Sequence, residues 1–182
     1  ALLPGSRKQE IQKMLEIMLS VTPDFPDYQF VIAGAPSQDQ DFYEPFLKKN
    51  RVHIVMNQTY NLLDVAHAAL VTSGTATLET ALFKVPEVVC YKGGRISYEI
   101  AKRVINLDYI SLVNLIMDRE VVKELIQTEF NTKTLKKALA EILEEEKRKA
   151  LFSEYYKLEK KLGGVGASAT TAKLIVNAIQ SN

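Results

Sequence analysis

The stretch ALVTSGTATLETALFKVPEVVCY, residues 69–91, decides the fold predicted for this chain. It opens with an apolar run that ends at Thr72, passes through Ser73 and Gly74, continues as a helical pattern from Thr75, and closes on a second apolar run. Short apolar runs without polar alternation are typical of parallel strands buried on both faces of a sheet. The stretch therefore predicts a strand, a tight turn, a helix and a second strand.

The same alternation extends over most of the chain. Apolar runs at residues 1–3, 28–33, 52–55, 69–72, 88–91 and 109–111 are separated by helical patterns. Ser6 and Ser37 are each followed three residues later by a glutamine, which is capping-box spacing, and Thr59 is expected to cap a further short helix. This order predicts an α/β fold, a doubly wound, Rossmann-like parallel sheet of about six strands, with ligands at the carboxyl ends of the strands.

From about residue 131 the pattern is helical only. A helix with one apolar stripe, formed by Leu135, Leu139, Ile142 and Leu143, is followed by helices predicted over residues 150–162 and 169–179. We therefore divide the chain into a Rossmann-like domain, residues 1–130, and a C-terminal helical segment, residues 131–182. The helical segment would pack on this domain, on a domain missing from the chain, or on another subunit, and its apolar faces could make the chain a homo-oligomer.

Composition excludes several classes of protein. The chain has 182 residues, 47% of them hydrophobic, which suits one compact domain or slightly more, and no apolar run approaches the roughly 18 to 20 residues of a membrane-spanning helix. The net charge of +1 disfavours a nucleic-acid partner, so any basic patch must be local. The single cysteine, Cys90, lies in an apolar run and is expected to be a buried thiol in a reducing, cytoplasmic compartment. His53 and His67 have no metal-ligand spacing, so we expect neither a metal nor a cofactor.

The turn between the strand at 69–72 and the following helix has the composition of a phosphate site. The first turn of a helix carries unpaired N–H groups and a partial positive charge, and Gly74 lets a ligand approach closely. Ser73, Thr75 and Thr77 add hydroxyl groups. Glu79 lies on the same helix face as Thr75 and could accept hydrogen bonds from a ribose diol. The alternative needs no ligand, because serine and threonine are ordinary N-caps and a glutamate near a helix N-terminus is stabilising.

A second turn of this kind follows the first strand. In PGSR, residues 4–7, Gly5 permits a tight turn, Ser6 can cap a helix, and Arg7 offers a fork of donors to phosphate. In a doubly wound sheet this turn lies beside the end of the fourth strand, at the topological switch point. Two phosphate-suited turns at neighbouring strand ends favour a site for a nucleoside diphosphate.

Three motifs resemble one family. LLPGSRKQEI at 2–11, TSGTATLETAL at 72–82 and DYISLVNLIMDREVVKELIQ at 108–127 are similar to lipid-A-disaccharide synthase, a family of bacterial GT-B glycosyltransferases. The resemblance covers nearly the whole chain but only the carboxyl-terminal half of the family, so it implies the C-terminal domain of a GT-B fold. It also implies an inverting reaction that joins UDP-2,3-diacylglucosamine to 2,3-diacylglucosamine 1-phosphate, forming a β(1→6) disaccharide and UDP.

The resemblance also implies roles for individual residues. Arg7 would contact phosphate or the sugar, residues 73–75 the diphosphate, and Glu79 the ribose. Asn114 and Gln127 fall in family motifs near the donor. Arg7 and Asn114 would support catalysis, while the general base is expected in the missing amino-terminal half. Charge that develops on the leaving diphosphate would be stabilised by the helix dipole, backbone donors and Arg7 without a metal.

Residues 91–104, YKGGRISYEIAKRV, combine basic, aromatic and aliphatic side chains. Both implied substrates are acylated, so a basic helix here could contact anionic lipids on the inner face of the bacterial inner membrane. The alternative is a helix packed on the core, with a solvated basic face.

Two other functions remain open at this point. Another UDP-sugar enzyme, such as an epimerase or a murein-precursor transferase, would share the phosphate and ribose contacts but not ISLVNLI and KELIQ. A stand-alone nucleotide-binding module is not expected to begin directly at its ligand loop, as ALLPGSR does.

Overall fold

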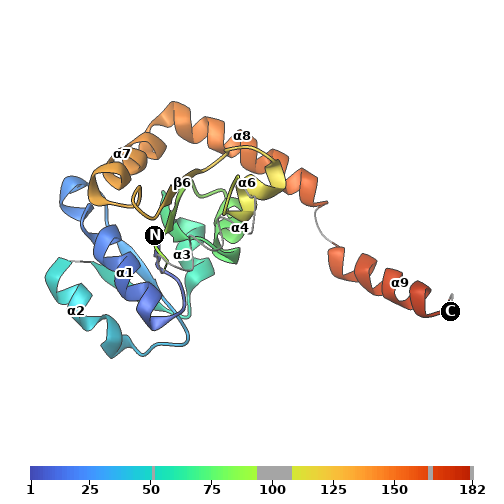
Figure 1. Ribbon diagram of the computed structural model, residues 1–182, viewed down its shortest axis with the longest axis horizontal. Helices are drawn as coiled ribbons and strands as arrows, with labels where there is room; N and C mark the ends of the chain where they lie inside the picture. Colours follow the sequence, from blue (N-terminus) through green and yellow to red (C-terminus); the bar gives the residue numbers. More distant parts are fainter. Residues whose placement is uncertain (51, 94–107, 164–165, 181–182) are drawn as a thin grey trace.

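The structure is a computed structural model that describes residues 1–50, 52–93, 108–163 and 166–180 (Figure 1). In these residues one six-stranded parallel sheet has the order β3-β2-β1-β4-β5-β6. Its strands are β1 (Leu2–Leu3), β2 (Val31–Gly34), β3 (His53–Met56), β4 (Ala69–Thr72), β5 (Glu87–Tyr91) and β6 (Lys123–Ile126). The chain order reverses between β1 and β4, so the prediction of a doubly wound, Rossmann-like sheet is confirmed.

The sixth strand was predicted wrongly. It was expected at residues 109–111, but Ser111 instead caps helix α6 (Leu112–Met117), because its hydroxyl accepts a hydrogen bond from a first-turn N–H group. β6 has the sequence KELI, so it lacks the continuous apolar run of the inner strands. It lies at the edge of the sheet, where Lys123 is exposed. Glu124 is buried, and its carboxylate accepts hydrogen bonds from backbone N–H groups.

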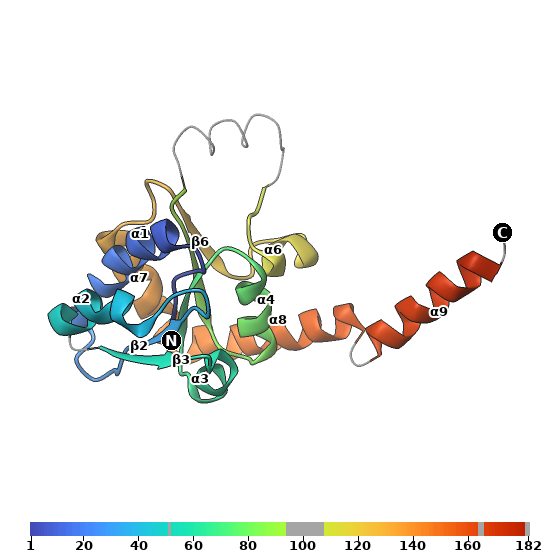
Figure 2. The same cartoon turned by 90° about the horizontal axis from the view of Figure 1, so that it is seen from below.

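Helices cover both faces of the sheet. Their bounds are α1 (Lys8–Leu19), α2 (Gln40–Asn50), α3 (Thr59–Val65), α4 (Thr75–Leu82), α6, α7 (Thr132–Leu143), α8 (Glu145–Leu162) and α9 (Ala167–Gln180), with a short 3-10 helix at Thr22–Asp24. Figure 2 shows α1, α2 and α7 on one face, and α3, α4, α6 and α8 on the other. This arrangement explains why the inner strands are apolar on both sides.

Successive strand residues enter two different hydrophobic clusters. Leu2 packs with the buried face of α1, which includes Met14, whereas Leu3 packs with Leu63 of α3 on the opposite face. Each of these side chains, fully buried, contributes about 1.5–3 kcal/mol relative to an exposed state. The buried thiol predicted for Cys90 is confirmed, since this residue lies in the larger cluster.

The predicted helix caps were wrong in three places. Arg7 rather than Ser6 occupies the N-cap of α1, and α3 begins at Thr59, one residue after its N-cap. Ser37 does not cap α2, because its hydroxyl donates to the main-chain oxygen of Ser6 at 2.6 Å. This bond instead ties the loop after β2 to the loop after β1. Sequence spacing could not reveal it, because it joins residues 31 positions apart.

The C-terminal helices differ in how they pack. Of the predicted apolar stripe of α7, Leu135, Leu139 and Ile142 are confirmed as buried, whereas Leu143 is only half-buried. Helix α8 buries Leu151, Tyr155 and Leu158. By contrast, α9 projects away from the rest of the chain and exposes Leu174 and Ile179 (Figures 1 and 2). Self-association through this segment stays a prediction.

Two features bear on membrane contact. None of the described helices combines the length and apolar content needed to cross a bilayer. Residues 94–104 of the segment predicted to contact lipid lie outside the described residues.

Candidate functional site

The loops after β1 and β4 line one pocket, which we call the donor pocket. The two strands are paired in register, Leu2 with Leu70 and Leu3 with Val71, so their carboxyl ends lie side by side. The pocket has a volume of about 410 Å³. Six of the ten predicted site residues line it: Gly5, Ser6, Ser73, Gly74, Thr75 and Glu79.

The turn between β4 and α4 leaves the start of the helix open. Gly74 occupies the N-cap with φ 153° and ψ −164°, a conformation that essentially only glycine adopts. It has no side chain to cap the first turn, so the amide N–H groups at the start of α4 can receive an anion. A Cβ built on Gly74 would meet no atom within 4 Å, so the space in front of this turn is open.

The hydroxyl groups around this turn are not equivalent. Ser73 donates to the main-chain oxygen of Ile110 at 2.9 Å, and the fully buried Thr77 donates to that of Gly74 at 2.9 Å. The role predicted for Thr77 toward a ligand stays a prediction, because its buried hydroxyl already donates to a main-chain oxygen within the turn. Thr75 is exposed at the pocket. Thr72, which was not predicted, also lines the pocket, and its buried hydroxyl has no hydrogen-bond partner among the described residues.

Glu79 lies one turn inside α4 and is held from a neighbouring helix. The Tyr60 hydroxyl, on α3, donates to Oε1 of Glu79 at 3.1 Å, and the Tyr60 ring stacks on Phe83 with 5.5 Å between ring centroids. The hydrogen bond and the negative charge of Glu79 raise the pKa of Tyr60, so the phenol keeps its proton. This contact fixes one carboxylate oxygen and leaves the other for a ligand. Sequence analysis missed Tyr60, although it lies in a polar loop-to-helix stretch after a strand.

On the other side of the donor pocket, Gly5 approaches Glu10. Gly5 has φ 104°, and a Cβ there would lie 2.5 Å from Oε2 of Glu10. The backbone conformation therefore favours glycine, and any larger residue would also displace the Glu10 carboxylate. Glu10, which was not predicted either, lines the donor pocket and also a neighbouring cavity.

Arg7 lies in that neighbouring cavity rather than in the donor pocket. The cavity has a volume of about 470 Å³ and is lined by Arg7, Lys8, Gln9, Glu10, Lys13, Tyr91, Lys92 and Gly93. A contact between the exposed side chain of Arg7 and the diphosphate stays a prediction.

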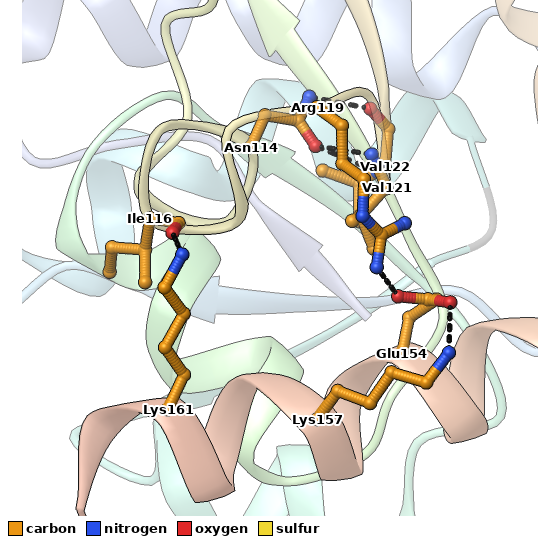
Figure 3. A network of polar contacts seen from close by, with 8 residues as sticks. All are labelled: Asn114, Ile116, Arg119, Val121, Val122, Glu154, Lys157 and Lys161. Atoms are coloured by element: carbon orange, nitrogen blue, oxygen red, sulfur yellow. Dashed lines mark hydrogen bonds and ion pairs between the residues drawn. The ribbon is translucent and has the colours of Figure 1, made fainter.

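Asn114 is fully buried, and both ends of its amide are engaged (Figure 3). Its Oδ1 accepts the N–H groups of Val121 at 2.7 Å and Val122 at 2.9 Å. Its Nδ2 donates to the main-chain oxygen of Val122 at 2.9 Å and to Glu124 at 2.8 Å. Asn114 therefore stabilises the conformation of the loop between α6 and β6. It does not line the donor pocket, so the predicted contact with the donor stays a prediction.

Glu124 completes this cluster. Besides Asn114, its carboxylate accepts the N–H groups of Ile110 and Ser111, each at 2.9 Å. Because Ile110 also accepts the Ser73 hydroxyl, the chain of contacts runs from Glu124 to the turn that opens the donor pocket. Figure 3 further shows the loop between α6 and β6 tied to α8, where Arg119 pairs with Glu154.

Gln127 follows β6 and does not line the donor pocket. Its backbone N–H donates to the main-chain oxygen of Tyr91 at 2.8 Å. Its side-chain amide nitrogen is buried without a partner among the described residues. The predicted donor contact of Gln127 also stays a prediction.

The histidines match their predicted role as surface or packing residues. His53 is exposed, and the His67 ring lies 5.8 Å from the Tyr28 ring between centroids. Within the part of the chain that the structure describes, no three histidine, cysteine or acidic side chains are grouped so as to hold a metal ion.

Comparisons with known proteins agree with this architecture. A family model described as lipid-A-disaccharide synthetase matches residues 1–176. The lipid-A-disaccharide synthase of Syntrophus aciditrophicus is 36% identical, over 100% of this chain and 50% of that protein. Those of Coxiella burnetii and Nitrosococcus oceani are each 33% identical, over 100% and 96% of this chain and 49% and 47% of theirs. The chain thus spans about half the length of the curated relatives that it matches. Because the family model covers nearly all of it, the chain belongs to the lipid-A-disaccharide synthetase family.

Proposed function

We propose that this chain is the donor-binding, carboxyl-terminal half of an inverting glycosyltransferase. The enzyme would transfer 2,3-diacylglucosamine from UDP-2,3-diacylglucosamine to 2,3-diacylglucosamine 1-phosphate and release UDP. The observation that carries this proposal is the donor pocket, in which uncapped amides at the start of α4 and the carboxylate of Glu79 lie one helical turn apart.

The diphosphate would bind at the start of α4. Backbone N–H groups and the helix dipole stabilise an anion there, and the exposed hydroxyl of Thr75 supplies a further donor. Negative charge grows on the diphosphate as the bond to the sugar breaks. Donors that are already oriented stabilise this charge without rearrangement, so they lower the barrier to transfer.

The ribose would bind at Glu79. A carboxylate accepts hydrogen bonds from both hydroxyls of a diol, and Tyr60 keeps Glu79 oriented toward the pocket. Removal of the ribose 2′-hydroxyl would leave a carboxylate oxygen without its donor. The site should therefore discriminate between UDP and 2′-deoxy-UDP.

Most of the binding site for the acceptor, and the general base, would lie outside this chain. Holding two reactants together accounts for much of the rate of a transfer reaction, so the chain by itself should bind UDP without catalysing transfer. Acylated substrates would lie in the inner leaflet, so the whole enzyme is proposed to work as a peripheral protein on the cytoplasmic face of the inner membrane.

Isothermal titration calorimetry with UDP and 2′-deoxy-UDP tests the proposal. Hydrogen bonds to charged groups contribute about 1.5–3 kcal/mol each, so Glu79→Ala should weaken UDP binding roughly tenfold or more and abolish discrimination against 2′-deoxy-UDP. Glu16→Ala is the matched control, because Glu16 is exposed on α1 and the change in charge is the same. If Glu79→Ala binds both nucleotides as the parent chain does, the ribose assignment is wrong.

A further inference from the structure

The cavity beside the donor pocket, which we call the basic pocket, concentrates positive charge. Four cationic side chains line it, Arg7, Lys8, Lys13 and Lys92, together with one carboxylate, Glu10. The whole chain carries a net charge of only +1, so this is a local basic patch in a nearly neutral protein.

These cations are not neutralised by the protein. Within the part of the chain that the structure describes, none of the four forms an ion pair. Lys92 donates only to the main-chain oxygen of Phe130, at 3.5 Å, and the Lys8 ammonium lies 5.6 Å from the centroid of the Phe42 ring. Like charges that lie close together repel one another, so this cluster gains most from an anionic ligand.

The basic pocket lies next to the donor pocket. Arg7 follows β1 and Lys92 follows β5, so both lie at the carboxyl edge of the sheet, as the donor pocket does. Glu10 lines both cavities, so the two cavities adjoin one another. Two anions could therefore bind side by side, one on backbone amides and one on cationic side chains.

We propose that the basic pocket binds a phosphomonoester and, in the reaction proposed above, the 1-phosphate of the acceptor sugar. A phosphomonoester carries a charge of about −1.5 to −2 at pH 7 and three strong acceptor oxygens. The planar guanidinium of Arg7 can bind two of these oxygens at once, and the lysines supply point charges around the third. The assignment to the acceptor rests on the proposed function, whereas the preference for a phosphomonoester rests on the charges alone.

Calorimetry with glucosamine 1-phosphate, added to the chain already saturated with UDP, tests the proposal. The double variant Lys13→Gln, Lys92→Gln should bind glucosamine 1-phosphate at least tenfold more weakly and keep its affinity for UDP. Lys133→Gln with Lys147→Gln is the control, because both lysines are exposed, form no ion pair with a described residue, and do not line the basic pocket. Glucosamine without phosphate should not bind.

Three outcomes would overturn the inference. Equal binding of glucosamine 1-phosphate by parent and double variant would show that the cations do not hold it. A parallel loss of UDP binding would show that they serve the donor diphosphate. Absence of binding by the parent, with UDP still bound, would refute this inference while leaving the proposed function intact.

Vesicles containing phosphatidic acid distinguish a lipid headgroup from a free sugar phosphate. If the double variant loses binding to these vesicles but not to glucosamine 1-phosphate, the assignment to the acceptor is wrong. If it loses glucosamine 1-phosphate while the control variant keeps it, the assignment to the acceptor is supported. Circular-dichroism melting of each variant checks that the fold is intact.

Discussion

Replacement of Asn114 by alanine should destabilise the fold without touching the donor pocket. The side chain is fully buried, and its amide makes four hydrogen bonds that hold the loop between α6 and β6. Loss of activity in such a variant of the whole enzyme would therefore not by itself identify a catalytic residue. Stability and ligand binding have to be measured separately.

The cost follows from the groups left without partners. Asn114→Ala leaves the N–H groups of Val121 and Val122 unpaired in the interior and takes one of three donors from Glu124. An unsatisfied buried polar group costs about 1–3 kcal/mol, and water entering the vacated space recovers part of this. We expect the free energy of unfolding to fall by about 3–6 kcal/mol, a large share of the roughly 5–15 kcal/mol typical of a domain.

Urea unfolding followed by far-ultraviolet circular dichroism measures this loss. The matched control is Asn61→Ala, because Asn61 is exposed on α3 and no side-chain hydrogen bond involves it in the described residues. The control should change stability by less than about 0.5 kcal/mol. Asn114→Asp should also be destabilised, because a second carboxylate would face Glu124 where the amide now donates.

Calorimetry with UDP completes the comparison. At a temperature where both chains are folded, Asn114→Ala should keep UDP affinity within a few fold of the parent. A variant that is as stable as the parent but has lost UDP binding would exclude a purely structural role for Asn114. Asn114 would then contact the donor directly.

Three further substitutions test other parts of the structure. Gly74→Ala should lower the free energy of unfolding by about 1–3 kcal/mol through backbone strain, and it should weaken UDP binding because the new methyl group enters the space before the amides. The control Gly163→Ala, also at positive φ, should lower the melting temperature but leave UDP binding unchanged. Tyr60→Phe should leave the fold unchanged but reduce the ratio of UDP to 2′-deoxy-UDP affinity measured by calorimetry, and an unchanged ratio would exclude a positioning role. Burial raises the pKa of Glu87 well above its ordinary value, so the folded chain keeps a proton that the unfolded chain releases, and stability should fall as pH rises above about 4.3. The stability of Glu87→Gln should depend less on pH in this range, as urea unfolding at several pH values would show.

Much of the fold could be predicted because the inner strands are buried on both faces. Strand β4 and the start of α4 at Thr75 match the prediction to the residue, since an apolar run ends where a glycine turn begins. Strand β6 could not be found in this way. Glu124 looks like a surface residue in the sequence, and it is buried only because three donors from residues 110–114 surround its carboxylate.

The candidate site was predictable to the extent that topology defines it. In a doubly wound sheet the loops after β1 and β4 must meet, so the order of the strands already placed Gly5 and Gly74 at one pocket. The contact of Tyr60 with Glu79 joins two helices and has no signal in residue spacing. Likewise, the position of Arg7 in the neighbouring cavity rather than in the donor pocket has no signal in residue spacing.

A crystal structure of the chain soaked with UDP would locate the nucleotide on the sheet edge. We expect diphosphate oxygens within hydrogen-bond distance of the amide N–H groups at the start of α4, and the ribose diol against Glu79. UDP bound elsewhere, for example with its diphosphate among the lysines of the basic pocket and its ribose away from Glu79, would rule out the proposed donor site.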